Sequence, residues 1–239
     1  MSESVFHFLN FTIRQDRCAM KVGTDGVLLG AWVKASAADS VLDIGTGTGL
    51  IALMICQKSN AHVDAIDIDE EACLQAKENV LESPWPDRVR VIHSSLQEFK
   101  PGRRYDLIVT NPPYFIDSFA PTDEARNRAR QASASLSYEE LLSGVIRLLA
   151  PSGKFFVILP AKEGQWFREL AEQDGLFCNH ITSLHTKADK PEKRVLMEFS
   201  RKEEEIVEDR LIIHNDEGSF TEAYKKLTGD YYPRFNAFR

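Results

Sequence analysis

The stretch that decides the fold is Val41-Leu-Asp-Ile-Gly45-Thr-Gly-Thr-Gly49, which runs directly into an apolar segment that begins at Leu50. A short apolar run that ends in glycines predicts a buried strand entering a tight turn. From Leu50 to Lys58 the apolar residues recur at helical spacing, so we expect the turn to lead into a helix. A strand, a glycine loop and a helix in this order form the first unit of an α/β fold.

Strands and helices continue to alternate after this unit. Further strands are predicted at 63–66, 89–92, 105–109 and 155–159, and further helices at 70–81, 138–149 and 163–172. This alternation predicts a doubly wound, mostly parallel sheet with helices on both faces. Strand-like runs at 178–184 and 195–199 follow each other without a helix, which favours an antiparallel edge hairpin. One more strand around 211–214 and one more helix around 220–227 complete the pattern.

Length and composition are those of a globular protein. The 239 residues contain 29 Lys and Arg and 36 Asp and Glu, which gives a net charge of −7, and 43% of the residues are hydrophobic. We expect one domain, 1–239, in which 1–35 precede the sheet, 36–200 form the core and 201–239 extend it. No apolar stretch has the length of a membrane span, no signal peptide is visible, and the four cysteines lack metal-binding spacing. The expected location is the cytoplasm, with no metal and no membrane partner.

An acidic residue follows the second predicted strand at the distance expected of a nucleoside site. Asp67 lies 18 residues after Gly49, near the spacing at which a carboxylate accepts hydrogen bonds from ribose hydroxyls. The loop reads Gly-x-Gly-x-Gly and differs from the Gly-x-Gly-x-x-Gly of dinucleotide sites. It resembles the first motif of class I methyltransferases, which bind S-adenosylmethionine. By this resemblance Asp43, Gly45, Gly47 and Asp67 hold the cofactor.

A rigid polar tetrapeptide, Asn111-Pro112-Pro113-Tyr114, follows the fourth predicted strand. Its two prolines favour an extended backbone, and in a doubly wound sheet it lies at the carboxyl end of a central strand, where ligands bind. The Asn111 side-chain oxygen and the Pro112 carbonyl can accept both N–H groups of an adenine amine or a glutamine amide, which directs the nitrogen lone pair toward a methyl donor. Pro113 and Tyr114 would contact the acceptor, with Tyr114 stacking on a base.

The glycine loop and the tetrapeptide together resemble the amino-methyltransferases of class I. That group includes adenine-N6 methyltransferases of DNA and RNA and glutamine-N5 methyltransferases of release factors. The resemblance implies a seven-stranded sheet of order 3-2-1-4-5-7-6, with strand 7 antiparallel. Only about 35 residues precede the sheet, which argues against the separate N-terminal domain usual in the release-factor enzymes. A DNA enzyme would need a larger target-recognition region, whereas another RNA adenine-N6 methyltransferase stays open as an alternative.

The N-terminal block Phe11–Trp32 narrows this choice. It resembles the opening of the bacterial valine-tRNA adenine-37 N6-methyltransferase family, and shorter similar pieces follow in order along nearly the whole chain. The resemblance implies that the block belongs to the cofactor pocket, which Lys21, Gly23, Thr24 and Asp25 would line together with Asn111. A helix cap by Thr24 or Asp25 is a second role for the same residues. Ser95 stands where many class I enzymes carry an acid that contacts the cofactor adenine.

Basic side chains must supply the contacts to tRNA in an acidic protein. The cluster of Arg126, Arg128 and Arg130 adjoins the tetrapeptide and is the preferred candidate, and Arg194 belongs to another cluster. We therefore expect a tRNA adenine-N6 methyltransferase that uses S-adenosylmethionine. The alternatives are a glutamine-N5 methyltransferase and a methyltransferase fold without turnover.

Overall fold

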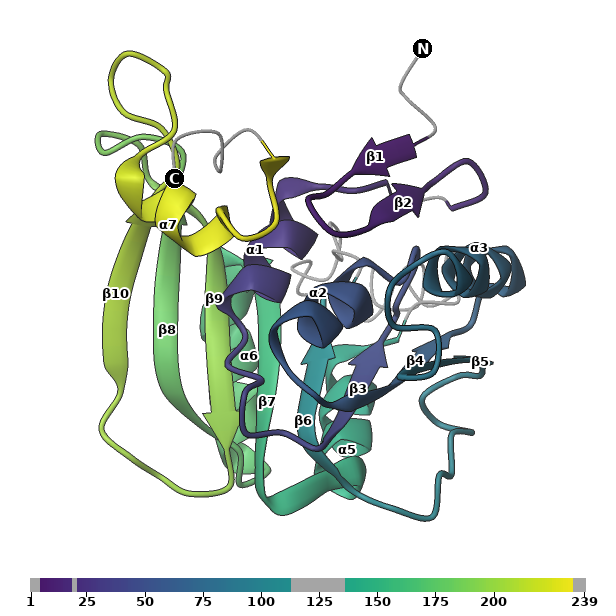
Figure 1. Ribbon diagram of the computed structural model, residues 1–239. Coiled ribbons are helices and arrows are strands. Elements are labelled where there is room, and N and C mark those ends of the chain that lie inside the picture. Colours follow the sequence, from purple (N-terminus) through teal and green to yellow (C-terminus); the bar gives the residue numbers. More distant parts are fainter. Residues whose placement is uncertain (1–4, 19–20, 113–135, 234–239) are drawn as a thin grey trace, which may run out of the picture.

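The computed structural model describes residues 5–18, 21–112 and 136–233, and Figure 1 shows their arrangement. Within them the main sheet has eight strands in the order β10-β8-β9-β7-β6-β3-β4-β5. These strands are β3 (Ser40–Ile44), β4 (His62–Asp67), β5 (Val89–His93), β6 (Tyr105–Thr110), β7 (Leu149–Pro160), β8 (Phe177–His185), β9 (Glu192–Ser200) and β10 (Val207–Ile212). Neighbouring strands are parallel except at β9, which is antiparallel to both β7 and β8.

The predicted strand order is confirmed. Seven of the described strands follow 3-2-1-4-5-7-6, and β9 is the antiparallel strand 7. The eighth strand, β10, pairs in parallel with β8 and extends the sheet by one position. The hairpin of β8 and β9 forms as expected, but β10 covers it, so the hairpin is not the edge.

Helices cover both faces of the sheet. They are α1 (Thr24–Trp32), α2 (Leu50–Lys58), α3 (Glu70–Leu81), α5 (Tyr138–Leu148), α6 (Ala161–Gln173) and α7 (Glu222–Thr228). Figure 1 shows α1 and α2 in front of the sheet and α5 and α6 behind it. Successive residues of a strand point to opposite faces, so Val41 packs in the cluster of α1, α2 and α7, while Leu42 packs in that of α5 and α6.

Strand β7 begins immediately after α5, six residues before the predicted start. Its pairing with β6 shifts between Leu149 and Lys154, so an irregularity lies at the place where proline and glycine suggested a loop. A Cβ added to Gly153 there would lie 2.8 Å from the Tyr105 carbonyl oxygen. The glycine thus allows the two backbones to approach closely.

A two-stranded hairpin near the N-terminus was not predicted. Strand β1 (Val5–His7) pairs with β2 (Thr12–Arg14), and neither strand joins the main sheet. The Phe8 and Phe11 rings stack with centroids 4.7 Å apart, and the Leu9 N–H donates to the Tyr231 carbonyl oxygen over 2.8 Å. The stacked rings pack the residues between the two strands against each other, and the hydrogen bond attaches the hairpin to the segment that follows α7.

The four cysteines are buried and unpaired, and burial raises the pKa of each thiol to about 11. Over the three described ranges, no helix has the length and apolar character needed to span a membrane. Among the same residues, His, Cys, Asp and Glu do not form a group of three or more that could hold a metal ion.

Candidate functional site: a glycine loop beside a buried amide

The glycine loop after β3 is held in a backbone conformation that side chains disfavour. Gly45, Gly47 and Gly49 have φ values of 69°, 53° and 81°, all in the left-handed region. A Cβ on Gly49 would touch Ala76 of α3 at 3.5 Å, whereas a Cβ on Gly45 or Gly47 would have no described atom within 4 Å. The third glycine therefore packs the loop against a helix, and the first two border open space.

Asp67, the last residue of β4, orders this loop. Its Oδ2 accepts from the Gly47 N–H over 2.8 Å, and its Oδ1 accepts from the Asp69 N–H over 3.0 Å. The side chain is half-buried, and each carboxylate oxygen can accept a further hydrogen bond. The sequence predicted a ribose-binding carboxylate here, and the observed contacts leave capacity for that role.

Asp43 lies beneath the loop and is fully buried. Its Oδ2 accepts from the Thr46 hydroxyl over 2.7 Å, and its Oδ1 has no hydrogen-bond partner in the described part of the chain. Burial raises the pKa of Asp43 to about 7, the Asp67 charge adds to this rise, and the Thr46 hydrogen bond opposes it. Because the carboxyl group is covered, it would act on a cofactor through its charge and through the loop.

The raised pKa predicts how stability depends on pH. The folded protein binds a proton at Asp43 more tightly than the unfolded chain, whose pKa is near 3.8. The Asp43 contribution to stability is therefore present at low pH and is lost as the pH rises through 7. Asp43→Asn stays neutral, so its stability relative to the wild type should increase by about 3 kcal/mol between pH 5 and pH 8.5. Urea unfolding of both proteins at the two pH values measures this change, and a constant difference would contradict it.

Asn111 follows β6 and lies beside the glycine loop. The Thr110 hydroxyl donates to the Ile44 carbonyl oxygen over 2.8 Å, which joins the last residues of β6 and β3. The Asn111 Oδ1 atom is buried and has no hydrogen-bond partner among the described residues. Its Nδ2 atom lies 3.9 Å from where a Cβ on Gly26 of α1 would stand, and Pro112 is buried. The structure thus brings an unsatisfied amide oxygen next to the open space of the loop.

Several predicted substrate contacts lie outside the described residues. These are Pro113, Tyr114, Arg126, Arg128 and Arg130. Their proposed roles stay predictions.

The start of α1 differs from the predicted cap. The helix begins at Thr24 with Gly23 as its N-cap residue, and no side chain caps it. A cap by Thr24 or Asp25 is therefore wrong, because both residues already lie in the first helical turn. A Cβ on Gly26 would approach Leu50, the first residue of α2, at 3.2 Å. Gly26 thus lies where α1 meets the start of α2, and the assignment of Gly23, Thr24 and Asp25 to the cofactor pocket stays a prediction.

Asp25 and Arg194 are far apart in the sequence and meet in the fold. The Arg194 Nε atom donates to the Asp25 Oδ2 atom over 3.0 Å, and both side chains are about one-third exposed or less. This pair joins the first turn of α1 to the beginning of strand β9. Lys21 is exposed and precedes α1.

Sequence reasoning missed two polar residues of α3 that hold the N-terminal segment over the site. The Asn79 Nδ2 atom donates to the carbonyl oxygens of Arg14 and Thr48, each over 2.9 Å, and its Oδ1 accepts from the Arg14 N–H over 2.8 Å. The Gln75 Oε1 atom accepts from the Arg17 N–H over 3.0 Å. Gln75 and Asn79 are both fully buried. Their i, i+4 spacing on the apolar face of a helix was the available signal.

Replacing Asn79 by alanine should release this segment. The change leaves the Arg14 N–H and two carbonyl oxygens without a side-chain partner, so we expect a loss of about 2–4 kcal/mol in the free energy of unfolding. Glu82→Ala, which removes only the exposed ion pair to Arg14, should cost less than about 1 kcal/mol. Urea unfolding of both variants tests this, and equal losses would contradict the assigned role of Asn79.

Ser95 follows β5 at the same edge of the sheet. Its hydroxyl donates to the Glu98 carboxylate and accepts from the Glu98 N–H, both over 3.2 Å. The preceding Ser94 N–H donates to the Asp67 carbonyl oxygen over 2.9 Å. Ser95 therefore lies near Asp67, the last residue of β4, and its hydroxyl takes part in a local turn with Glu98. A contact with a cofactor adenine stays a prediction.

This fold and site define a class I methyltransferase. The family model described as "Methyltransferase small domain" matches residues 19–164. A solved predicted O-methyltransferase from Agrobacterium tumefaciens shares the fold with a TM-score of 0.67 at 16% identity, over 87% of this chain and 96% of that one.

Closer relatives define the family within this class. A protein of Trichodesmium erythraeum named tRNA1(Val) (adenine(37)-N6)-methyltransferase is 45% identical over 240 residues, which cover 98% of this chain and 100% of the relative. A protein of the same name from Bacteroides fragilis is 43% identical, over 97% of this chain and 99% of the relative. The chain belongs to this tRNA1(Val) (adenine(37)-N6)-methyltransferase family.

Proposed function

We propose that this protein transfers a methyl group from S-adenosylmethionine to the exocyclic N6 of adenine 37 in valine tRNA. The family relationship supports adenine N6 in tRNA as the acceptor, because the relatives that match almost the full chain bear that name. The same names support the valine tRNA as the substrate. A cytoplasmic location is part of the proposal, since that is where such a tRNA is processed.

The described residues fit S-adenosylmethionine. Open space borders Gly45 and Gly47, and Asp67 stands at the end of the neighbouring strand. Asp43 is a buried carboxyl group with one unpartnered oxygen and a pKa near 7, so a cationic group nearby would favour its charged form. Bound here, the cofactor would supply a methyl group on a positively charged sulfur.

The observation that carries the proposal is the unpartnered Asn111 oxygen at the end of β6. A buried acceptor without a donor costs free energy unless a ligand supplies one. The adenine amine has two N–H groups, and the Asn111 Oδ1 and the Pro112 carbonyl would accept one each. Two such bonds turn the nitrogen lone pair away from the ring and toward the glycine loop. The residues of the site therefore accelerate the reaction mainly by orienting the amine.

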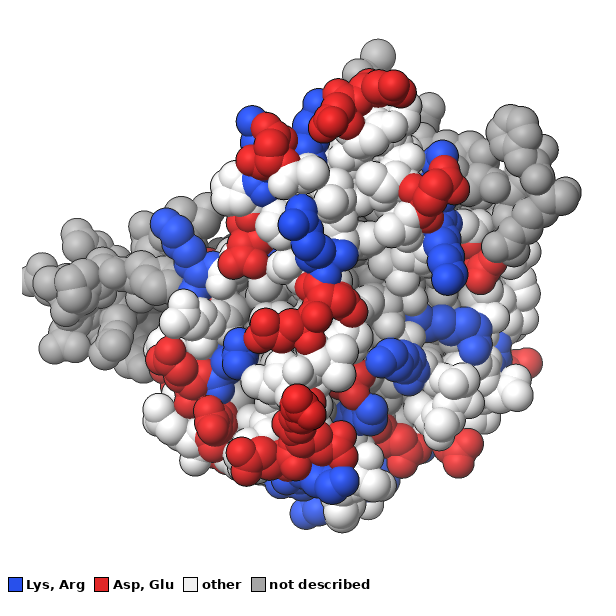
Figure 2. Space-filling view, turned by 90° about the vertical axis from the view of Figure 1, so that its left-hand side faces the viewer, with Lys and Arg blue, Asp and Glu red and all other residues white. Residues whose placement is uncertain are grey.

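The charge distribution favours a local contact with the tRNA. Figure 2 faces the side of the molecule that carries β10, and basic and acidic side chains are intermingled on it, with acidic ones gathered toward its lower end. Such a surface does not attract a phosphate backbone over its whole area. The basic residues that serve the tRNA would accordingly lie near the site, as Arg194 does.

Methyl transfer from labelled S-adenosylmethionine to total tRNA and, separately, to a purified release factor tests this function. The expected product is N6-methyladenosine in digested tRNA, with no label in the release factor. Label in the release factor alone would instead assign the Asn111 chemistry to a glutamine amide.

A further inference from the structure

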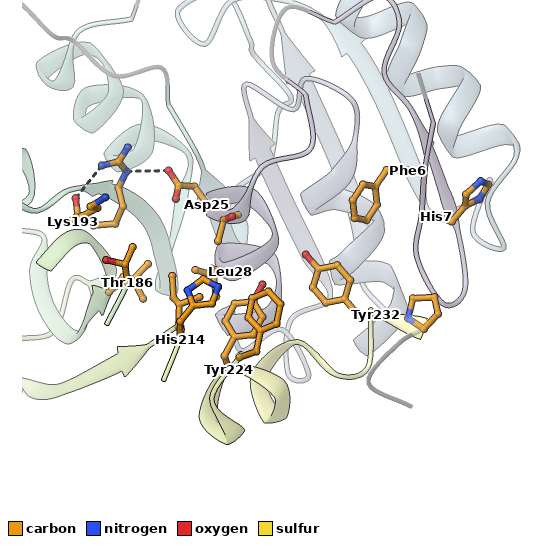
Figure 3. Close-up of a pocket in the computed structure, with 15 residues that line it drawn as sticks. Phe6, His7, Asp25, Leu28, Thr186, Lys193, His214, Tyr224 and Tyr232 are labelled. Carbon is orange, nitrogen blue, oxygen red and sulfur yellow. Dashed lines mark hydrogen bonds and ion pairs between the residues drawn. The ribbon is translucent and has the colours of Figure 1, made fainter. Parts of the chain in front are cut away.

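A cavity of about 760 Å³ opens at the same edge of the sheet as Asn111. The N-terminal hairpin, the first turn of α1, the turn between β8 and β9, and the α7 region enclose it. Figure 3 shows Lys193 and Asp25 at one end, and Tyr232, Phe6 and His7 at the other. Thr24 and Asp25, two of the expected cofactor contacts, line it, whereas none of the expected contacts on the glycine loop does.

Planar side chains form much of the cavity wall. The rings of Phe220 and Tyr224 are stacked, with centroids 4.6 Å apart and an interplanar angle of 14°, and His214 lies 4.8 Å from Phe220. The Tyr232 ring, on the other side, packs against Phe6 with centroids 6.2 Å apart. Tyr224 and Tyr232 are buried, so the wall that a ligand would meet is formed by the partly exposed rings of Phe6, His214 and Phe220. Such rings are the usual partners of unpaired bases, because every base presents a π-face for stacking.

Cationic groups stand at one mouth of this aromatic cavity. Lys193 is exposed at the rim, and the Arg194 guanidinium contributes a second positive charge that Asp25 partly balances. A nucleotide combines a planar base with a phosphate. The base would contact the aromatic walls of the cavity, and the phosphate would contact the cationic groups at its rim. A purely apolar ligand or an acidic peptide would complement only one of the two.

The cavity lies on the side of Asn111 that a substrate would occupy. In the sheet order, β6 is followed on one side by β3 with the glycine loop and on the other by β7, β9, β8 and β10. Thr24 and Asp25 line the cavity, and the next residue, Gly26, faces Asn111. The first turn of α1 is therefore the wall between the methyl-acceptor site and the cavity.

We propose that this cavity binds an unpaired nucleotide of the tRNA anticodon loop that neighbours the target adenine. This inference rests on the proposed function and adds to it a second base-binding site. Target selection would then depend on two nucleotides, one presented to Asn111 and one held between the α7 region and the N-terminal hairpin.

Two substitutions test the cavity without touching Asn111 or the glycine loop. Thr186→Trp places a large side chain in the cavity and should raise the KM for valine tRNA at least tenfold. Its control, Thr186→Val, keeps the size of the side chain. Lys193→Glu reverses a rim charge and should have an effect of similar direction. Its control is Lys190→Glu, in the same turn, because Lys190 does not line the cavity and its Nζ lies 3.2 Å from the Asp189 carboxylate.

A tRNA series identifies the bound nucleotide. Full-length valine tRNAs, each with one abasic residue in the anticodon loop, would be assayed with the wild type and with Thr186→Trp. One abasic position beside the target should raise the wild-type KM at least tenfold and should have no further effect in Thr186→Trp. Cofactor affinity and thermal stability are measured on every variant to identify a folding defect. If Thr186→Trp is unstable, the KM of Lys193→Glu with the same tRNA series tests the cavity instead.

The outcomes separate the two proposals. If the wild type methylates tRNA but the cavity variants and the abasic series leave KM unchanged, the second base site is refuted while the proposed function stands. If Lys190→Glu raises the KM for valine tRNA as much as Lys193→Glu does, the overall charge of this turn accounts for the effect, and the cavity proposal is refuted. If the wild type methylates no tRNA, both proposals are overturned.

Discussion

Replacing Asn111 by alanine is expected to lower kcat/KM for methyl transfer by about a hundredfold to a thousandfold, while cofactor affinity stays within a few-fold of the wild type. The Asn111 Oδ1 atom has no partner in the described structure, so its main role begins when an acceptor amine arrives. Its loss removes one of two groups that orient the amine. Single-turnover methyl transfer, together with calorimetric cofactor binding, measures the two effects separately.

A conservative variant keeps this prediction specific. Asn111→Asp retains an acceptor oxygen at the same place, so it should recover part of the activity that alanine loses. If Asn111→Ala loses cofactor binding while the protein stays folded, the main role of Asn111 is to hold the cofactor, and its assigned role in orienting the acceptor amine is wrong. Equal losses in both variants would show that the acceptor oxygen is not what matters.

Replacing Asp67 by alanine should weaken cofactor binding by about thirtyfold or more. The carboxylate holds the Gly47 N–H over 2.8 Å, and we expect its remaining acceptor capacity to bind the ribose. Losing both a loop contact and a ligand contact corresponds to roughly 2–3 kcal/mol. Equilibrium binding of S-adenosylmethionine to the purified variant measures the loss.

The neighbouring Asp69 provides a matched control. Its side chain is the N-cap of α3 and accepts from the Glu71 N–H over 2.9 Å. Asp69→Ala removes the same charge from the same turn and should cost about 1 kcal/mol of stability, with little change in cofactor affinity. If Asp67→Ala binds the cofactor as tightly as the wild type, the ribose assignment is refuted. If both variants lose affinity equally, the net charge of this turn is responsible.

The core of the fold was predictable from sequence because local pattern and tertiary contacts agree there. Helices α2 and α3 begin and end at the predicted residues, since a glycine loop precedes one and the Asp69 cap precedes the other. The strands β3 to β6 are short apolar runs whose alternate residues are buried on two faces. Their order followed from the resemblance and is confirmed by the pairing.

The strands that the sequence did not predict correctly, β1, β2 and the beginning of β7, share a physical cause. Strands β1 and β2 have three residues each and pair only with each other, so no periodicity could identify them. Strand β7 continues through Pro151 and Gly153, which usually end such elements, because the pairing register shifts there. Tertiary contacts, rather than local preference, decide the structure of both segments.

The site was predictable where one residue type serves one geometric purpose. The glycines of the loop have positive φ values, and Asp67 and Asn111 stand at the carboxyl ends of β4 and β6, the two strands that flank β3. The pairing of Asp25 with Arg194 and the tether through Asn79 depend on residues 169 and 65 positions apart, which no local pattern reveals.

The most direct test of the account uses a valine tRNA transcript and the same transcript with adenine 37 replaced by guanine. Both would be incubated with the wild-type protein and labelled S-adenosylmethionine and then digested to nucleosides. The account predicts label in N6-methyladenosine from the first transcript and no label from the second. Equal labelling of both transcripts would contradict adenine 37 as the acceptor, and labelling of neither, by a folded protein that binds the cofactor, would contradict tRNA methylation itself.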